Sequence, residues 1–170
     1  MPADPAWRRL DALDDPVLHG LIRRKLAEVR TAARSIPRGR LDAQLVHGDW
    51  HDGNILYQGG AVSGILDFDF AHPDLPLVDV AIAALIPDVE DSAQIAAGYF
   101  GARSPTEHDL GLIATAQRAR GLGHVAFFLD RHADGDHGAL DQIRLGVDLL
   151  LRAEQRWPAL RAAILHGATG

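Results

Sequence analysis

The chain has 170 residues, of which 47% are hydrophobic and 24% charged, so it is long enough to form one domain with a buried core. It contains no cysteine, which excludes disulfides and thiolate metal sites, and its formal net charge of −6 argues against nonspecific binding to nucleic acid. No apolar run approaches the roughly 18 residues that span a bilayer, and the N-terminal residues lack the apolar stretch of a signal peptide, so we expect a cytoplasmic protein without membrane contact.

The first predicted helix runs from Pro16 to Arg34. Apolar residues recur in it at steps of three and four, which is the spacing of one helix face, and Pro16 suits a first helical turn. The polar, proline-interrupted residues 1–15 precede this helix, and the segment Ser35–Gly39 is predicted to break it.

A small β module is predicted next. Strand-like runs at Leu45–Val46 and Asn54–Tyr57 flank a polar loop, and Gln58–Gly60 turns the chain into another strand at Ala61–Leu66. The residues His72 and Asp74 that follow are interpreted as turn-forming.

Beyond Pro76 the pattern is helical. Leu77–Ile86 is nearly all apolar and predicts a buried helix, and a shorter helix is expected at Ser92–Phe100. Leu140–Arg156 is predicted to form a last long helix that ends at Trp157–Pro158, before a short helical tail.

A long helix is predicted to start at Ser104 and to run to about His132. Ser104 is the expected N-cap, Pro105 lies in the first turn, and Glu107 occupies the capping-box position. Gly121 and Gly123 are expected to loosen this helix. The sequence therefore predicts a mainly helical α+β chain, with a lead-in and amphipathic helix over residues 1–40, and with a small β-hairpin module beside a helical bundle (residues 77–168) over residues 41–170.

Three oxygen-bearing side chains near the polar loop point to phosphoryl transfer. Asp49 lies in the loop, Asn54 follows five residues later, and Asp67 ends the next predicted strand. Transfer to a hydroxyl needs a carboxylate that orients the nucleophile and Mg²⁺ that neutralises the triphosphate, and Mg²⁺ takes oxygen ligands from one or two side chains and from the phosphates. Protein kinases present a catalytic-loop Asp, an Asn and a downstream Asp in the same order.

The segment from Leu45 to Ala81 resembles the aminoglycoside phosphotransferase family, which includes choline-kinase-like and other small-molecule kinases. The resemblance rests on H-G-D-W-H-D-G-N at residues 47–54, I-L-D at residues 65–67 and D-V-A at residues 79–81, all in order. It implies the C-terminal lobe of the protein-kinase-like fold, with a catalytic loop at 45–57 and a metal-site hairpin at 61–70. It also implies an enzyme that uses Mg²⁺ and transfers the γ-phosphate of ATP (or GTP) to a hydroxyl of a small molecule.

The resemblance implies a role for each matching residue. Asp49 would be the catalytic base or the hydroxyl-orienting residue, and Asn54 and Asp67 would hold Mg²⁺. Asp79 would start the following helix and support the catalytic loop.

Other residues of this segment are expected to act as support. His47 is interpreted as holding the loop through backbone hydrogen bonds rather than as a general base, and Asp69 could assist the metal or simply be solvated. Trp50 and His51 are predicted to pack the loop, and an approach of His51 to the nucleotide or the acceptor is the open alternative.

The N-terminal nucleotide-binding lobe of the family is predicted to be absent. In the kinase template a glycine-rich loop covers the phosphates and a strand lysine binds them, but here 46 residues precede the loop and their one lysine, Lys25, lies in a predicted helix. The alternative is therefore a truncated, catalytically silent binding module, or a subunit that needs a second chain, with an exposed face that attracts a missing-lobe partner or self-associates. A metal-dependent hydrolase built on His47, Asp49 and Asp67 is a third hypothesis, which lacks a further ligand at metal spacing.

Overall fold

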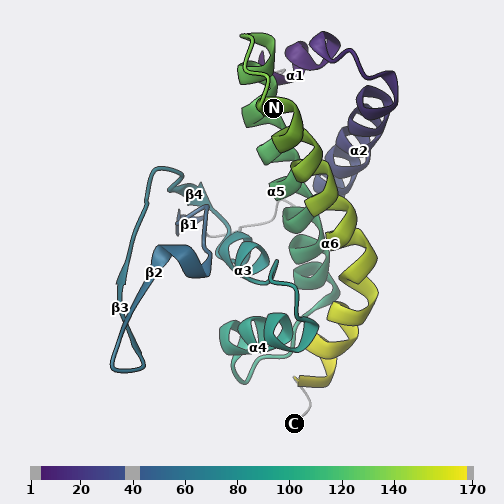
Figure 1. Cartoon of the computed structure of the whole chain (residues 1–170). Coiled ribbons are helices and arrows are strands. Elements are labelled where there is room, and N and C mark those ends of the chain that lie inside the picture. Colours follow the sequence, from purple (N-terminus) through teal and green to yellow (C-terminus); the bar gives the residue numbers. More distant parts are fainter. Residues whose placement is uncertain (1–4, 37–42, 168–170) are drawn as a thin grey trace. The chain divides into compact units, whose positions relative to one another are not determined.

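The computed structural model describes residues 5–36 and 43–167, and these form helices and two small sheets (Figure 1). The predicted break at Pro37–Gly39 lies outside the described residues. The mainly helical α+β prediction is confirmed. In chain order the elements are α1 (Pro5–Arg8), the 3₁₀ helix η1 (Arg9–Ala12), α2 (Pro16–Ser35), β1 (Gln44–Val46), the 3₁₀ helix η2 (Asp52–Asn54), β2 (Ile55–Gln58), β3 (Ala61–Ile65), β4 (His72–Asp74), α3 (Leu77–Ala83), α4 (Val89–Phe100), α5 (Glu107–Ala133) and α6 (Ala139–Gly167).

The chain divides into two compact units. One consists of Met1–Ser35 with Arg118–Gln155, and the other of Ile36–Gln117 with Arg156–Gly170, so α5 and α6 each contribute residues to both. None of the helices within the described residues is long and apolar enough to cross a membrane.

The first unit is built around the buried face of α2. Leu18, Ile22 and Val29 are buried at helical spacing, and Ile22 packs in a cluster with Val125 and Ile143 of the long helices. Lys25 donates from Nζ to Glu154 at 2.7 Å, and this hydrogen bond raises the pKa of Lys25, so the lysine ties α2 to α6.

In this unit α5 and α6 touch at two glycines. A Cβ atom added at Gly121 would lie 2.7 Å from the carbonyl oxygen of Gly146 and 2.9 Å from Cβ of Leu150. A Cβ atom added at Gly146 would lie 2.9 Å from the carbonyl oxygen of Gly121. The helix α5 continues unbroken through this point, so the expected loosening is wrong and Gly121 instead allows the two backbones to approach.

We expect Gly121→Ala to lower the free energy of unfolding by about 1–3 kcal/mol, because the added methyl group collides with backbone that cannot move alone. Gly123→Ala is the matched control on the same helix, because nothing lies within 4 Å of its added Cβ, and it should stabilise the protein by up to about 1 kcal/mol through helix propensity. Chemical denaturation followed by circular dichroism measures both. Equal effects of the two substitutions would contradict the close helix contact.

The second unit has its own core, in which α3 and α4 pack with parts of α5 and α6. Gln117 is buried and donates from Nε2 to the carbonyl oxygens of Ala81 at 3.1 Å and Ala84 at 3.2 Å, which satisfies backbone acceptors at the end of α3. This fixes α3 on the core, and α3 carries Asp79.

Several predicted helix boundaries are wrong. The helix α3 ends at Ala83 rather than Ile86. The helix α4 starts at Val89 rather than Ser92, because Asp88 caps it by accepting from Asp91 N at 2.9 Å. The helix α6 continues through Pro158. A proline inside a helix costs about 3 kcal/mol, because it lacks a backbone N–H donor and its ring clashes with the preceding turn. Burial of the residues beyond it, including Ile164, in the core of the second unit offsets this cost.

The start of α5 is another wrong boundary. Thr106 and Asp109 cap each other, since the Asp109 carboxylate accepts from Thr106 N at 2.8 Å and Thr106 Oγ1 accepts from Asp109 N at 3.2 Å. Burial favours a higher pKa for Asp109, but hydrogen bonds from Arg103 and Thr106 outweigh it and lower the pKa. The helix therefore starts at Glu107, two residues after the predicted Pro105, and neither Ser104 nor Glu107 fills its predicted capping position.

Candidate functional site

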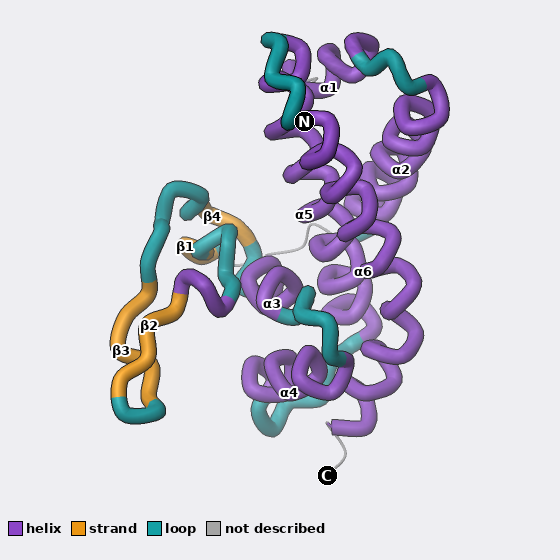
Figure 2. Tube along the Cα trace, in the orientation of Figure 1, coloured by secondary structure: helices purple, strands orange, loops and turns teal. Residues whose placement is uncertain are grey.

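The loop at residues 47–54 connects a strand of one two-stranded sheet to a strand of another. β1 pairs antiparallel with β4, and β2 with β3 (Figure 2). The strand β4 replaces the turn that was predicted around His72 and Asp74. A three-residue strand of sequence H-P-D has no alternating apolar pattern, and its proline is tolerated because the sheet consists of edge strands alone.

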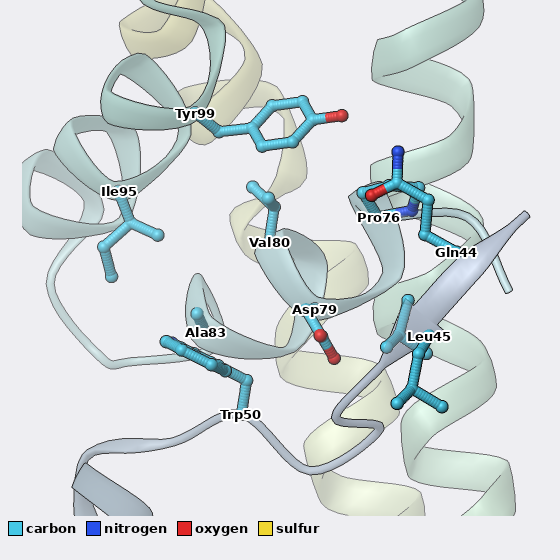
Figure 3. A pocket seen from close by; sticks show the side chains of 10 residues that line it. Gln44, Leu45, Trp50, Pro76, Asp79, Val80, Ala83, Ile95 and Tyr99 are labelled. Atoms are coloured by element: carbon cyan, nitrogen blue, oxygen red, sulfur yellow. The ribbon is translucent and has the colours of Figure 1, made fainter. Parts of the chain in front are cut away.

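Asp79 anchors the start of the loop. Its carboxylate accepts from two consecutive backbone donors, His47 N at 2.7 Å and Gly48 N at 2.8 Å. Figure 3 shows Asp79 projecting from α3 toward the loop. Two charge-assisted hydrogen bonds therefore join the loop to the helix that Gln117 fixes on the core.

The imidazole of His47 is 4% exposed and uses both nitrogens on the backbone. Nδ1 accepts from Asp49 N at 3.3 Å, so the ring carries its proton on Nε2 and donates it to the carbonyl oxygen of Leu66 at 2.7 Å. The ring also packs against Trp50 and Phe68. His47 thus connects the loop to the chain segment that leads into Asp67, and neither nitrogen is available as a metal ligand.

Asp49 and Asn54 are brought together inside the loop. They are 8% and 7% exposed, and Asn54 Nδ2 donates to the carbonyl oxygen of Asp49 at 3.0 Å. The carbonyl oxygen of Asn54 accepts from Leu66 N at 2.9 Å, which extends the pairing of Ile55 with Ile65. One hydrogen bond from the Asn54 side chain and one from the Leu66 backbone therefore place Asp49, Asn54 and the residue before Asp67 next to one another.

Asp67 has an unusual backbone conformation. Its φ is 59°, and within residues 5–36 and 43–167 no other non-glycine residue has a positive φ. Such a conformation costs about 1–2 kcal/mol, less for Asp than for most residues, and strained backbone of this kind gathers at functional sites. The side chains of Asp67 and of Asp69 are exposed.

Gly48 is a residue of this loop that sequence reasoning did not single out. Its φ is +79°, and an added Cβ would collide with the carbonyl oxygen of Phe70, whose carbonyl carbon would be 3.1 Å away. The loop and the segment after Asp67 therefore approach each other too closely for any side chain here. The sequence signal for this close approach was a glycine between His47 and Asp49, two residues to which the sequence analysis assigned roles.

The donor chemistry of the loop fits Mg²⁺ better than a softer metal. The candidate ligands are an amide oxygen on Asn54 and a carboxylate on Asp67, and no three His, Cys, Asp or Glu side chains in the described part of the chain gather closely enough to hold a metal ion. Mg²⁺ needs only one or two protein ligands when phosphates supply others, whereas a zinc hydrolase needs at least three. The hydrolase hypothesis also loses His47, whose nitrogens both bond to backbone groups.

A pocket of ≈ 290 Å³ lies beside the loop and is mostly apolar (Figure 3). Trp50 lines it from the loop, and Tyr99 lines it from α4. Among the described residues that line it, Asp79 has the one charged side chain, and that carboxylate already accepts the two loop donors. Asp49, Asn54 and Asp67 do not line the pocket, so it neighbours the candidate site without containing it.

The chain is similar in sequence and in fold to known phosphotransferases. Residues 2–114 match the model of a family described as the phosphotransferase enzyme family. A homoserine kinase of Chelativorans sp. (strain BNC1) is 30% identical over 128 residues, which are 68% of this chain and 39% of the relative. A homoserine kinase of Sinorhizobium fredii (strain NBRC 101917 / NGR234) is 28% identical over 138 residues, which are 76% of this chain and 41% of the relative.

Among solved structures, the chain is similar to a thermostable mutant of the aminoglycoside phosphotransferase APH(4)-Ia in a ternary complex with AMP-PNP and hygromycin B. The TM-score is 0.62 at 18% identity, and the match covers 94% of this chain and 48% of that chain. The two share a fold. The chain spans about two fifths of the length of the curated relatives and about half of that structure.

Proposed function

Because the chain belongs to the phosphotransferase enzyme family, we propose that it transfers the γ-phosphate of ATP, or of GTP, to a hydroxyl group of a small molecule. The observation that carries this proposal is the hydrogen-bonded loop, in which Asp79 holds the backbone, Asn54 bonds to Asp49, and residue 66 bonds to both His47 and Asn54. These bonds link the loop that carries Asp49 and Asn54 to Leu66, the residue directly before Asp67.

Asp49 acts on the acceptor. The acceptor oxygen forms a bond to the γ-phosphorus, the bond from this phosphorus to the bridging oxygen of the β-phosphate breaks, and the hydroxyl proton passes to the Asp49 carboxylate. The side chain of Asp49 is only 12% exposed, so its charge is weakly screened and its orientation toward the hydroxyl is restricted.

Asn54 and Asp67 hold the metal. Bound Mg²⁺ supplies neutralisation of the triphosphate charge. The Asn54 amide donates through Nδ2 to the loop backbone, which leaves Oδ1 as its ligand atom, and the exposed carboxylate of Asp67 is the second ligand. Asp69, which is exposed two residues later, is a further carboxylate near this position.

Homoserine is the first acceptor to test. The curated relatives reported above are homoserine kinases, and the structure with the same fold is a complex with hygromycin B. The acceptor class to examine is therefore an alcohol that also carries an amino group. The net charge of −6 suits a neutral or cationic acceptor better than an anionic one.

A second candidate is a silent binding module, or a subunit that another chain completes. It is favoured by exposed apolar side chains on and after the β2–β3 hairpin, which as a lone two-stranded sheet has marginal stability. These side chains, which are 46–58% exposed, are Leu56, Tyr57, Val62, Leu66, Phe68 and Phe70. A partner chain or a second copy would cover them.

Calorimetric titration of the 170-residue chain with ATP, with and without Mg²⁺, separates the two candidates. We expect Asp67→Asn to weaken Mg²⁺-dependent ATP binding by about 10–100-fold, because the amide removes the anionic ligand while asparagine still tolerates the positive φ. Glu90→Gln is the matched control, an equal loss of charge on the exposed surface of α4, and it should leave the affinity unchanged. If the wild-type chain shows no binding of ATP with or without Mg²⁺, the enzyme proposal for this chain is overturned and the second candidate remains.

A further inference from the structure

We propose that His51 is a positioning residue that holds the carboxylate of Asp49 through its Nε2–H group; this inference rests on the proposed function. Sequence reasoning expected His51 to pack the loop. Its ring instead makes two directed contacts, one with the backbone of the turn and one with the side chain of Asp49.

The first contact orients the ring. His51 precedes η2 in extended conformation, and its Nδ1 accepts from Gly53 N at 3.1 Å, which caps the turn. Its carbonyl oxygen also accepts from Asn54 N at 2.9 Å. A Cβ atom added at Gly53 would lie 2.9 Å from Cε1 of the ring and 3.0 Å from Nδ1, so glycine leaves the space that the imidazole occupies.

The second contact follows from the first. Because Nδ1 accepts a backbone N–H, the neutral ring carries its proton on Nε2, and Nε2 lies 3.7 Å from Oδ2 of Asp49. This distance is longer than a hydrogen bond, but catalytic hydrogen bonds are often long before the substrate binds and shorten in the complex. The ring is 51% exposed, so it has room for the small rotation that closes the gap.

A donor on Oδ2 has a chemical consequence. The terminal torsion of an aspartate side chain is soft, so a donor that holds one oxygen restricts the orientation of the whole carboxylate toward the acceptor hydroxyl. His47, the other imidazole of the loop, does not supply this donor, because its Nε2 proton goes to Leu66 O.

The role of residue 51 as the N-cap of η2 does not by itself require a histidine. Asparagine, aspartate or serine at this position would cap the turn equally well, and what the imidazole adds is a second nitrogen that reaches Asp49. Two substitutions separate these functions. His51→Asn keeps an acceptor near the position of Nδ1 and lacks the reach to Asp49, whereas His51→Gln keeps a donor near the position of Nε2.

Steady-state kinetics of the full chain with ATP and homoserine test the role in turnover. His51→Asn should lower kcat by about 10–100-fold with KM values within about threefold, and His51→Gln should recover most of the loss, because the amide replaces the Nε2 donor. The reverse order, an active His51→Asn and an inactive His51→Gln, would show that the ring serves only the cap and would overturn the proposal.

A second measurement does not depend on turnover. In ¹⁵N-histidine spectra of the full chain, at a pH where the imidazole is neutral, Asp49→Asn should move the Nε2 resonance of His51 and leave Nδ1 in place. An unmoved Nε2 resonance would overturn the positioning role even in an active enzyme. If the wild-type chain shows no turnover but Nε2 responds to Asp49→Asn, the proposed function fails and the contact stands.

Discussion

Replacing Asp49 with asparagine lowers kcat by about 10²–10⁴-fold, because the acceptor hydroxyl loses the group that takes its proton. The amide has nearly the shape of the carboxylate, and the bond from Asn54 Nδ2 ends on the backbone oxygen of residue 49, so the loop keeps its conformation. The affinity for ATP with Mg²⁺ should stay within a few-fold of wild type. Coupled detection of ADP with homoserine as acceptor measures turnover, and calorimetry measures nucleotide binding.

Asp52→Asn is the control for Asp49→Asn. It removes the same charge from the same loop at an exposed position, and it should change kcat by no more than about twofold. Full activity in Asp49→Asn would remove Asp49 from the mechanism. Similar losses in both variants would mean that the loop contributes overall negative charge rather than a specific base.

The meeting of Asn54 with the segment before Asp67 could be predicted because the information for it is local. Gly59 and Gly60 both have positive φ, 61° and 82°, as a tight hairpin turn requires, and this turn brings the two strands together. An irregularity between Leu56 and Tyr57 then shifts the register by one residue before Ile55 pairs with Ile65, and the turn residues do not encode that shift. The resemblance of residues 45–81 to a phosphotransferase family is confirmed by the match over residues 2–114 and by the shared fold.

The contacts that hold the site together are not encoded locally, although the family resemblance implied supporting roles for His47 and Asp79. His47 bonds to the carbonyl of Leu66 across 19 residues and to Asp79 across 32, and no short-range pattern encodes either pairing. The positive φ of Asp67 could not be predicted either, because aspartate tolerates this conformation better than most residues but does not require it.

The wrong helix boundaries have a related cause. Pro158 is a strong local stop signal, but burial of the residues that follow it in the second core outweighs the local cost. At α5 two capping patterns overlap within six residues, Ser104 with Glu107 and Thr106 with Asp109. The second pattern forms, and the bond from Arg103 to Asp109 at 2.7 Å stabilises it. At Pro158 tertiary packing overrides a local signal, whereas at α5 one local capping pattern forms instead of another.

Asp79→Ala should have the largest combined effect on stability and activity of any substitution that leaves Asp49, Asn54 and Asp67 in place. It leaves two adjacent backbone N–H groups of the loop without their carboxylate acceptor. Hydrogen bonds to a charged group contribute about 1.5–3 kcal/mol each, and water in the neighbouring pocket can replace part of them, so we expect a loss of about 2–4 kcal/mol in the free energy of unfolding. The kcat should fall by at least about 10²-fold, because Asp49 follows directly after the two released residues and a displacement of about 1 Å suffices for such a loss.

Asp88→Ala distinguishes loop displacement from general destabilisation. Asp88 is also a carboxylate of the second unit that accepts a backbone N–H, from Asp91 at 2.9 Å, but it caps α4 and does not touch the loop. Its loss should cost about 1 kcal/mol of stability and leave kcat unchanged. Amide resonances of His47 and Gly48 should shift in Asp79→Ala alone. If those resonances and kcat stay at wild-type values while stability falls, Asp79 serves the fold of α3 and not the geometry of the loop, and the connection from the core through α3 to Asp49 is refuted.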